Sequence, residues 1–194
     1  MLATLSLNLN FMGMQTNFTL VSDCQATLIP AGDTVVLEKG TAVTVTQALG
    51  NSITVRTALG LFRIAENDLA ALGPEAQVYR EKKSVQSNQG PLNVETVWGA
   101  LRECFDPEIP VNIVDLGLIY DLSLEDGSAG GKRVNVKMTL TAQGCGMGPV
   151  IATDAKSKIE ALAGVESAEV AIVWDPVWNP RMISESGRKQ LGLE

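Results

Sequence analysis

The residue best suited to chemistry is Cys145, in the glycine-rich segment Gly144-Cys145-Gly146-Met147-Gly148. Pro149 follows, and because proline is favoured at the first helical position we expect a helix to begin there. Free N–H groups and the macrodipole at a helix N-terminus favour an anion, and therefore thiolate over thiol. A thiolate attacks electrophiles and binds metals. The alternative is a tight loop around a buried, small, apolar cysteine.

The chain contains no histidine. Its absence excludes Ser-His and Cys-His catalytic pairs, His-ligated metals and general acid–base chemistry by histidine. Any metal site must therefore use thiolates, carboxylates, backbone groups or an external ligand.

The other two cysteines, Cys24 and Cys104, are predicted to be structural. Cys24 alternates with apolar residues, and Cys104 lies on or near the apolar face of a predicted helix. The three cysteines are far apart in the sequence and form no CxxC pair, so we expect neither a disulfide framework nor a closed zinc site within one chain. Reduced thiols indicate a cytoplasmic protein.

The composition is typical of a soluble globular protein. The chain has 194 residues, of which 45% are apolar and 19% charged, enough for one medium domain or two small ones. A net charge of −7 argues against nucleic-acid binding and against docking to anionic lipid. No apolar run is long enough to span a bilayer, and the N-terminus makes a poor signal peptide.

Residues 17–72 are expected to form a small β-rich domain. Short β-branched runs alternate with glycine-containing turns, at a spacing that suggests a small barrel or a curled sheet. We interpret Arg56 and Arg63 on these strands as solvated.

Two segments flank this domain. Residues 1–16 are an edge strand or a disordered leader, the latter with Met12 or Met14 as the true start. Residues 73–92 are polar and contain Pro74 and Gly90-Pro91, which is typical of an interdomain linker.

Residues 93–194 predict a second domain with the element order α-β-β-α-β-α. Its first helix is capped by Asn93, and a half-buried strand runs from Val134 through Leu140. A helix follows the Cys145 segment, then a strand over Val165–Trp174 and a short terminal helix from Asn179. The fold class is therefore α+β, with helices on a three-stranded sheet in a two-layer sandwich.

Three motifs in this half resemble the PaaD-like domain that recurs in metal–sulfur cluster biogenesis proteins. They are DPEIPVNIVDLGLIY (Asp106–Tyr120), MTLTAQGCGMGP (Met138–Pro149) and WDPVWNPRMISESGRKQLGL (Trp174–Leu193), in the order of that family. The segment ATLIPAGDTVVLEKGTAVTVTQALGNSITV resembles the leading domain of SufT-type iron–sulfur cluster assembly proteins.

The resemblance implies a non-enzymatic factor that helps to deliver or mature iron–sulfur clusters on client proteins. It also implies a set of site residues, namely Cys145, Asp106 and Glu108 of DPE, Asp115 of DLG, and Thr139 and Thr141 of the strand before the cysteine. One departure is Cys145-Gly146, where many members have Cys-Pro, and it predicts a more mobile loop.

Iron–sulfur clusters are typically held by four thiolates, so one loop cysteine cannot satisfy a cluster. The cluster or iron would be transient and shared across a homodimer, with a client, or with small thiols. Our hypothesis is that Cys145 is the metal ligand and that Asp115 or Glu108 lies close enough to modulate it. The alternative for Asp106 and Asp115 is structural, as caps of a helix end and a turn.

Two other classes of function compete with a cluster carrier. In an adaptor, the chain links cluster scaffold or carrier proteins to client apoproteins, and the tryptophans of WDPVWNP serve as interface anchors unless they close the core. A thiol enzyme that uses Cys145 is the weakest option, because no evident base accompanies the cysteine.

Overall fold

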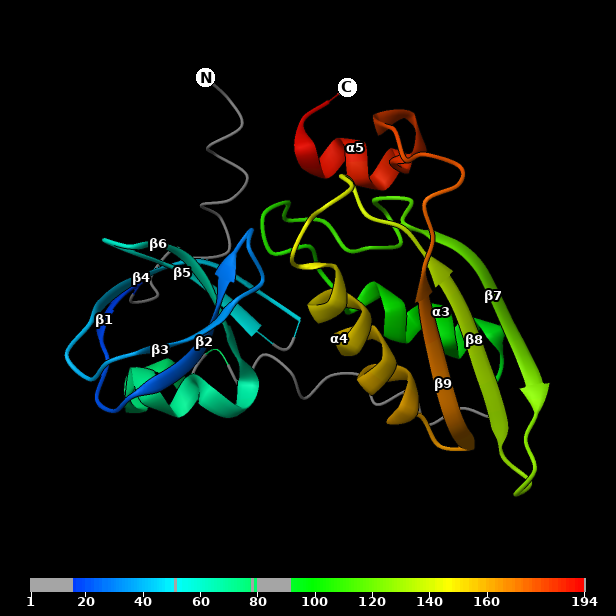
Figure 1. The fold of residues 1–194 in the computed structure, drawn as a ribbon, viewed down its shortest axis with the longest axis horizontal. Helices are drawn as coiled ribbons and strands as arrows, with labels where there is room; N and C mark the ends of the chain where they lie inside the picture. The colour runs from blue at the N-terminus through cyan, green and yellow to red at the C-terminus, as the bar shows by residue number, and fades with distance from the viewer. Residues whose placement is uncertain (1–15, 51, 78, 80–91, 194) are drawn as a thin grey trace.

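The computed structural model describes residues 16–50, 52–77, 79 and 92–193 (Figure 1). Residues 1–15 of the predicted leader and residues 80–91 of the predicted linker lie outside the described residues.

The first half folds into one sheet of six strands in the order β1-β4-β5-β6-β2-β3, with antiparallel pairs throughout. The strands are β1 (Asn17–Thr19), β2 (Cys24–Ile29), β3 (Thr34–Leu37), β4 (Ala42–Leu49), β5 (Ser52–Thr57) and β6 (Gly60–Ala65). In the described part of the chain the sheet is open, with β1 and β3 at its edges, so it is a curled sheet rather than a closed barrel.

Two short 3-10 helices complete this domain, η1 (Glu66–Leu72) and η2 (Pro74–Gln77). Ala76 of η2 is 2% exposed and belongs to the same core as Leu69 and Leu72. The β-rich domain therefore continues past residue 72, where we had predicted the linker to begin, because this small apolar side chain completes its core.

The second half has the predicted order α-β-β-α-β-α. Its elements are α3 (Val94–Arg102), β7 (Ile119–Asp126), β8 (Lys132–Met138), α4 (Gly148–Glu160), β9 (Val165–Ile172), the 3-10 helix η3 (Pro180–Met182) and α5 (Glu185–Leu191). Strand β8 is central, antiparallel to β7 and parallel to β9. Figure 1 shows α3 and α4 on one face of this sheet, which confirms the α+β class.

Local sequence signals explain these elements. Asn93 caps α3 through a capping box in which its side chain accepts from the Thr96 N–H and Thr96 accepts from the Asn93 N–H. Val134, Val136 and Met138 alternate along β8 and are buried beneath the helices.

The C-terminal segment differs from the single terminal helix that we predicted. Asn179 caps only the short η3, and Ile183 is extended. The chain then starts a separate helix, α5, because Ser184 provides a second N-cap, and Gly192 ends it with a left-handed φ of 68°.

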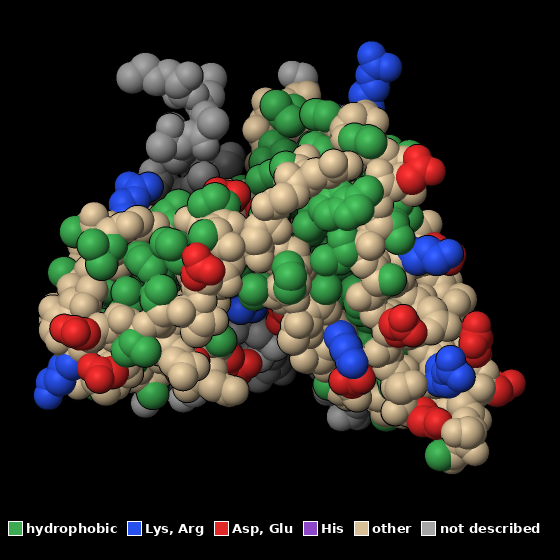
Figure 2. Space-filling view, in the orientation of Figure 1, with side chains coloured by type: hydrophobic (Ala, Val, Ile, Leu, Met, Phe, Trp, Pro, Cys, Tyr) green, Lys and Arg blue, Asp and Glu red, His purple; other side chains and the backbone are tan. Residues whose placement is uncertain are grey.

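The two domains share an apolar contact. Ile29 at the end of β2 is 5% exposed and belongs to the core of the second domain, and Leu61 of β6 packs against that core. Figure 2 shows the surfaces of the two halves in contact. Within the described residues, no helix combines the length and the apolar character needed to cross a membrane.

Candidate functional site

Cys145 lies in the loop between β8 and α4, which we call the Cys145 loop (residues 141–147). The loop leaves β8 through Thr139, which is 1% exposed and donates its N–H to the Leu118 carbonyl at 2.8 Å, and Thr141 is half-buried. Cys145 is half-buried, and its backbone carbonyl accepts a hydrogen bond from the Gly148 N–H at 3.2 Å. Helix α4 begins at Gly148, one residue before the predicted start.

The other two cysteines differ from Cys145 in being buried. Burial raises the pKa of Cys24 to about 11, with a smaller contribution from Asp68. Burial also raises the pKa of Cys104 to about 12, although the nearby Lys158 opposes the shift. Both side chains are thiols at neutral pH, and the predicted structural roles of Cys24 and Cys104 agree with this burial.

Asp106 organises its own turn, Asp106–Ile109, which we call the Asp106 turn. Its Oδ1 accepts from the N–H groups of Glu108 and Ile109, each at 2.8 Å. The residue is 8% exposed, and burial raises the pKa of its carboxyl while the two backbone donors oppose that rise. The Glu108 side chain is exposed. These contacts favour the capping alternative for Asp106.

Asp115 connects its own turn to the start of α5 through hydrogen bonds. Its Oδ2 accepts from Asn112 Nδ2 at 2.6 Å, and its Oδ1 accepts from the Ser184 hydroxyl at 2.6 Å. The Ser184 N–H donates to the Asp115 carbonyl at 2.8 Å, and the Ser184 hydroxyl also accepts from the Gly187 N–H at 3.0 Å. Sequence reasoning missed Ser184, although a serine just before a helix is a recognisable N-cap signal.

The structure distributes the predicted site residues over three local units rather than one. Within the described residues, no group of three or more Cys, Asp or Glu side chains is placed to hold a metal ion. Asp106 is bonded within its own turn, and Asp115 is bonded to Asn112 and Ser184. A direct effect of Asp115 or Glu108 on Cys145 stays a prediction.

The β-rich domain contacts the Cys145 loop and helix α4. Gly146 contacts the β2–β3 turn at Ala31 and Gly32, which gives this glycine a packing role in a loop that we had predicted to be mobile. Arg63, predicted to be solvated, has a side chain only 16% exposed and pairs with Asp154 of α4 at 3.7 Å. The prediction that Arg63 is solvated is therefore wrong, because the second domain covers its side chain.

The two tryptophans of WDPVWNP have different surroundings. Trp178 is half-buried and donates its Nε1–H to the Leu116 carbonyl at 2.8 Å, so it closes the core. Trp174 is 39% exposed and the neighbouring Val177 is 67% exposed.

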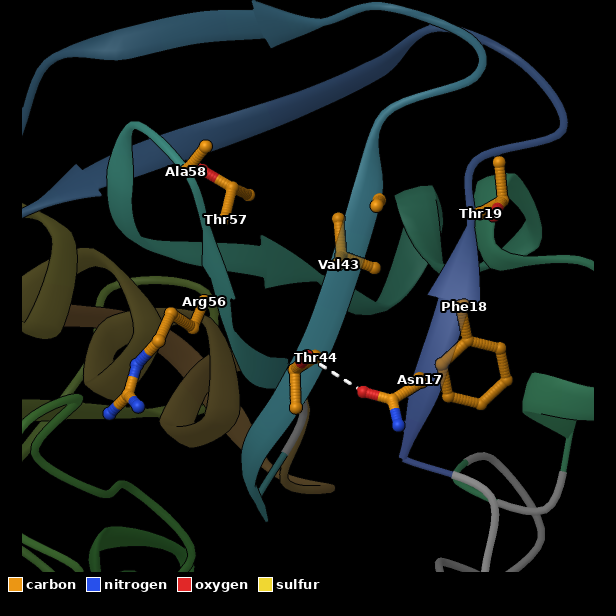
Figure 3. Close-up of a pocket in the computed structure, with 9 residues that line it drawn as sticks. Asn17, Phe18, Thr19, Val43, Thr44, Arg56, Thr57 and Ala58 are labelled. Carbon is orange, nitrogen blue, oxygen red and sulfur yellow. Dashed lines mark hydrogen bonds between the residues drawn. The ribbon is translucent and has the colours of Figure 1, made fainter.

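A pocket on the β-rich domain lies next to β1, β4 and β5 (Figure 3). Figure 3 shows Asn17 and Thr44 joined by a hydrogen bond of 2.8 Å, with Arg56 nearby on β5. None of the site residues predicted from the sequence lines this pocket.

Residues 94–172, from α3 to β9, match the family model described as "Iron-sulfur cluster assembly protein". The chain belongs to this family, as the resemblance in its sequence predicted.

Within the family the chain is of the SufT type. It is 39% identical over 101 residues to the "Fe-S protein maturation auxiliary factor YitW" of Bacillus subtilis, covering 52% of this chain and 94% of that protein. It is 38% identical over 88 residues to the "Fe-S protein maturation auxiliary factor SufT" of Staphylococcus aureus, covering 45% of this chain and 96% of that protein.

A crystal structure of a domain of unknown function from Bacillus anthracis is also similar, with 31% identity, a TM-score of 0.47, and coverage of 52% of this chain and 92% of that chain. The β-rich domain lies outside the match to the family model.

Proposed function

We propose that this protein is a non-enzymatic maturation factor that helps to deliver iron–sulfur clusters to client apoproteins, with Cys145 as a transient thiolate ligand. Membership of the family supports the assembly role, and the two relatives are named as maturation auxiliary factors. The cluster is cargo in this proposal.

The observation that carries the proposal is the contrast among the three cysteines. Cys24 and Cys104 are buried thiols with raised pKa values, whereas Cys145 is half-buried in a loop. Iron binds thiolate rather than thiol, so a ligand must be accessible and able to ionise. Burial excludes Cys24 and Cys104 on both counts, which leaves the half-buried Cys145 as the candidate ligand.

One cysteine supplies one of the four thiolates that a cluster typically needs. The remaining ligands in this proposal come from a second copy of the chain, from the client or from small thiols. The partners are therefore cluster scaffold or carrier proteins and client apoproteins. We propose no nucleic-acid or membrane partner, and we place the protein in the cytoplasm.

The test is anaerobic reconstitution with iron and sulfide of the wild type, Cys145→Ser and Cys24→Ala. Absorbance and iron quantification report the cluster, size-exclusion chromatography reports a bridged dimer, and incubation with a purified apo-ferredoxin reports transfer. We expect cluster absorbance and transfer in the wild type and in Cys24→Ala, and their loss in Cys145→Ser. Equal iron in the wild type and in Cys145→Ser would contradict the ligand role.

The exposed Trp174 and Val177 favour a second candidate, an adaptor that binds scaffold and client without holding metal. Trp174→Ser and Cys145→Ser separate the two candidates when a pull-down with the same apo-ferredoxin is combined with the transfer assay. An adaptor loses binding only in Trp174→Ser, whereas a carrier keeps client binding in Cys145→Ser but transfers no cluster.

A further inference from the structure

A polar row crosses three neighbouring strands of the β-rich sheet. Gln47 of β4 pairs with Thr54 of β5, and Thr54 pairs with Arg63 of β6. Directly paired residues present their side chains on the same face, so these three, which we call the polar row, lie side by side. A shift in the β4–β5 register between Val45 and Gln47 marks a local bulge, and bulges re-aim side chains.

Each member of the polar row contacts the second domain. Gln47 donates its Nε2–H to the Asp106 carbonyl at 3.0 Å, and the Thr54 hydroxyl donates to the Pro107 carbonyl at 3.2 Å. Arg63 pairs with Asp154 of α4 at 3.7 Å. Gln47 is 9% and Thr54 5% exposed, and buried polar groups of this kind are retained where a partner satisfies them. Here the partners are the carbonyls of the Asp106 turn.

The Cys145 loop contacts the same domain through its backbone at Gly146. A Cβ added at Gly146 would overlap the carbonyl of Ala31, and a Cβ added at Gly32 would overlap the carbonyl of Gly146. Gly146 is not among the glycines with positive φ, so it is required for close approach rather than for an unusual backbone conformation. Ile29, two residues before Ala31, continues this contact into the core of the second domain.

We propose that the β-rich domain is a docking platform that positions both the Asp106 turn and the Cys145 loop, with Gln47, Thr54 and Arg63 as positioning residues. Docking covers the backbone next to Cys145 and limits access to its thiol. This inference rests on the proposed function only in treating Cys145 as the working group. It assigns the β-rich domain a role in controlling that cysteine.

The test is the rate at which iodoacetamide alkylates Cys145 in the native full-length chain, measured by mass spectrometry of the Cys145 peptide. Cys24 and Cys104 are buried and remain thiols at neutral pH, so they do not compete. We expect Thr54→Val, Arg63→Gln and Gly146→Ala each to accelerate alkylation. An acceleration of about five-fold corresponds to the loss of one weak contact.

Two controls separate positioning from general destabilisation. Thr54→Ser keeps the hydroxyl and should restore the wild-type rate. Arg56→Gln removes an exposed cation from the same face of β5, two residues from Thr54, and should leave the rate unchanged.

Unchanged or slower alkylation in Thr54→Val and Arg63→Gln would overturn the docking proposal, even if Gly146→Ala failed to fold. Reconstitution of the same variants distinguishes this result from failure of the proposed function. If the platform controls Cys145, the variants that disturb it accelerate alkylation whether or not the wild type binds a cluster. Failure of the carrier proposal appears only in the reconstitution.

Discussion

Cys145 differs from Cys24 and Cys104 in its surroundings. A thiol that is taken out of water loses the solvation of its charged form, which is why burial raises the pKa of Cys24 and Cys104 to about 11 and about 12. The loop position leaves Cys145 half-buried, next to a helix start. The same residue type is therefore core filling at two positions and a candidate ligand at the third.

Asp106 gives a prediction with a pH dependence. Burial raises the pKa of the Asp106 carboxyl in the folded state. Its contribution to the free energy of unfolding is therefore fully present below the pKa that the carboxyl has in the unfolded chain. That contribution is lost as the pH rises through the pKa in the folded state. An asparagine side chain at this position would keep the acceptor oxygen without the charge. We expect Asp106→Asn to gain stability relative to the wild type as the pH rises from about 4 to neutral.

Urea unfolding at several pH values measures this difference. Asp106→Ala is the matched control, since it leaves the N–H groups of Glu108 and Ile109 without their acceptor and should be less stable than Asp106→Asn by about 1–3 kcal/mol at every pH. Parallel stability curves for the wild type and Asp106→Asn would mean that the buried carboxyl does not titrate differently on folding.

At the scale of elements, α5 is held to the turn that carries Asp115 by close contacts. A Cβ added at Gly117 would overlap the Met182 carbonyl, and one at Gly187 would lie 2.9 Å from the Asp115 carbonyl. Ser184 connects the two segments, because it caps α5 and also donates to Asp115. The DLG motif thus has an architectural role in this chain, whatever its role toward a cluster.

Ser184→Ala should destabilise the protein by about 1–2 kcal/mol, because it removes both the N-cap and the hydrogen bond to Asp115. Thermal unfolding followed by circular dichroism measures the loss. Ser186→Ala is the control, since Ser186 is exposed within the same helix and should change stability little. If the two variants unfold at the same temperature, the Ser184 contacts contribute nothing to stability.

At the scale of the whole molecule, the two domains are joined by a shared core as well as by the polar row. All three tryptophans, Trp98, Trp174 and Trp178, lie in the second domain, so their fluorescence reports on that domain alone. Ile29 belongs to the β-rich sheet but packs in the core of the second domain.

Ile29→Ala should therefore lower the unfolding midpoint seen by tryptophan fluorescence, at a cost of about 2–5 kcal/mol. Leu20→Ala is the comparison, because Leu20 is also buried but belongs to the core of the β-rich domain only. A fluorescence midpoint unaffected by Ile29→Ala would show that the two domains unfold independently.

Local patterns in the amino-acid sequence were enough to locate most elements and to identify the family. Alternation placed Val134, Val136 and Met138 on one face of β8, Asn93 marked the start of α3, and the motifs around Asp106, Cys145 and Trp174 carried the resemblance. These signals can be recognised in the sequence because strand period, helix period and capping each depend on a few neighbouring residues.

The residues that cover each face became known from the folded chain and not from local patterns. The sequence pattern placed Arg63 on a strand, but it did not indicate that Asp154, distant in the chain, would pair with Arg63. Nor did it indicate that Gln47 would donate to the Asp106 carbonyl. The folded structure also separated the predicted ligands into local units and placed Gly146 against Ala31. Such contacts join residues far apart in the chain, and their energies depend on how two folded surfaces fit, which no local pattern encodes.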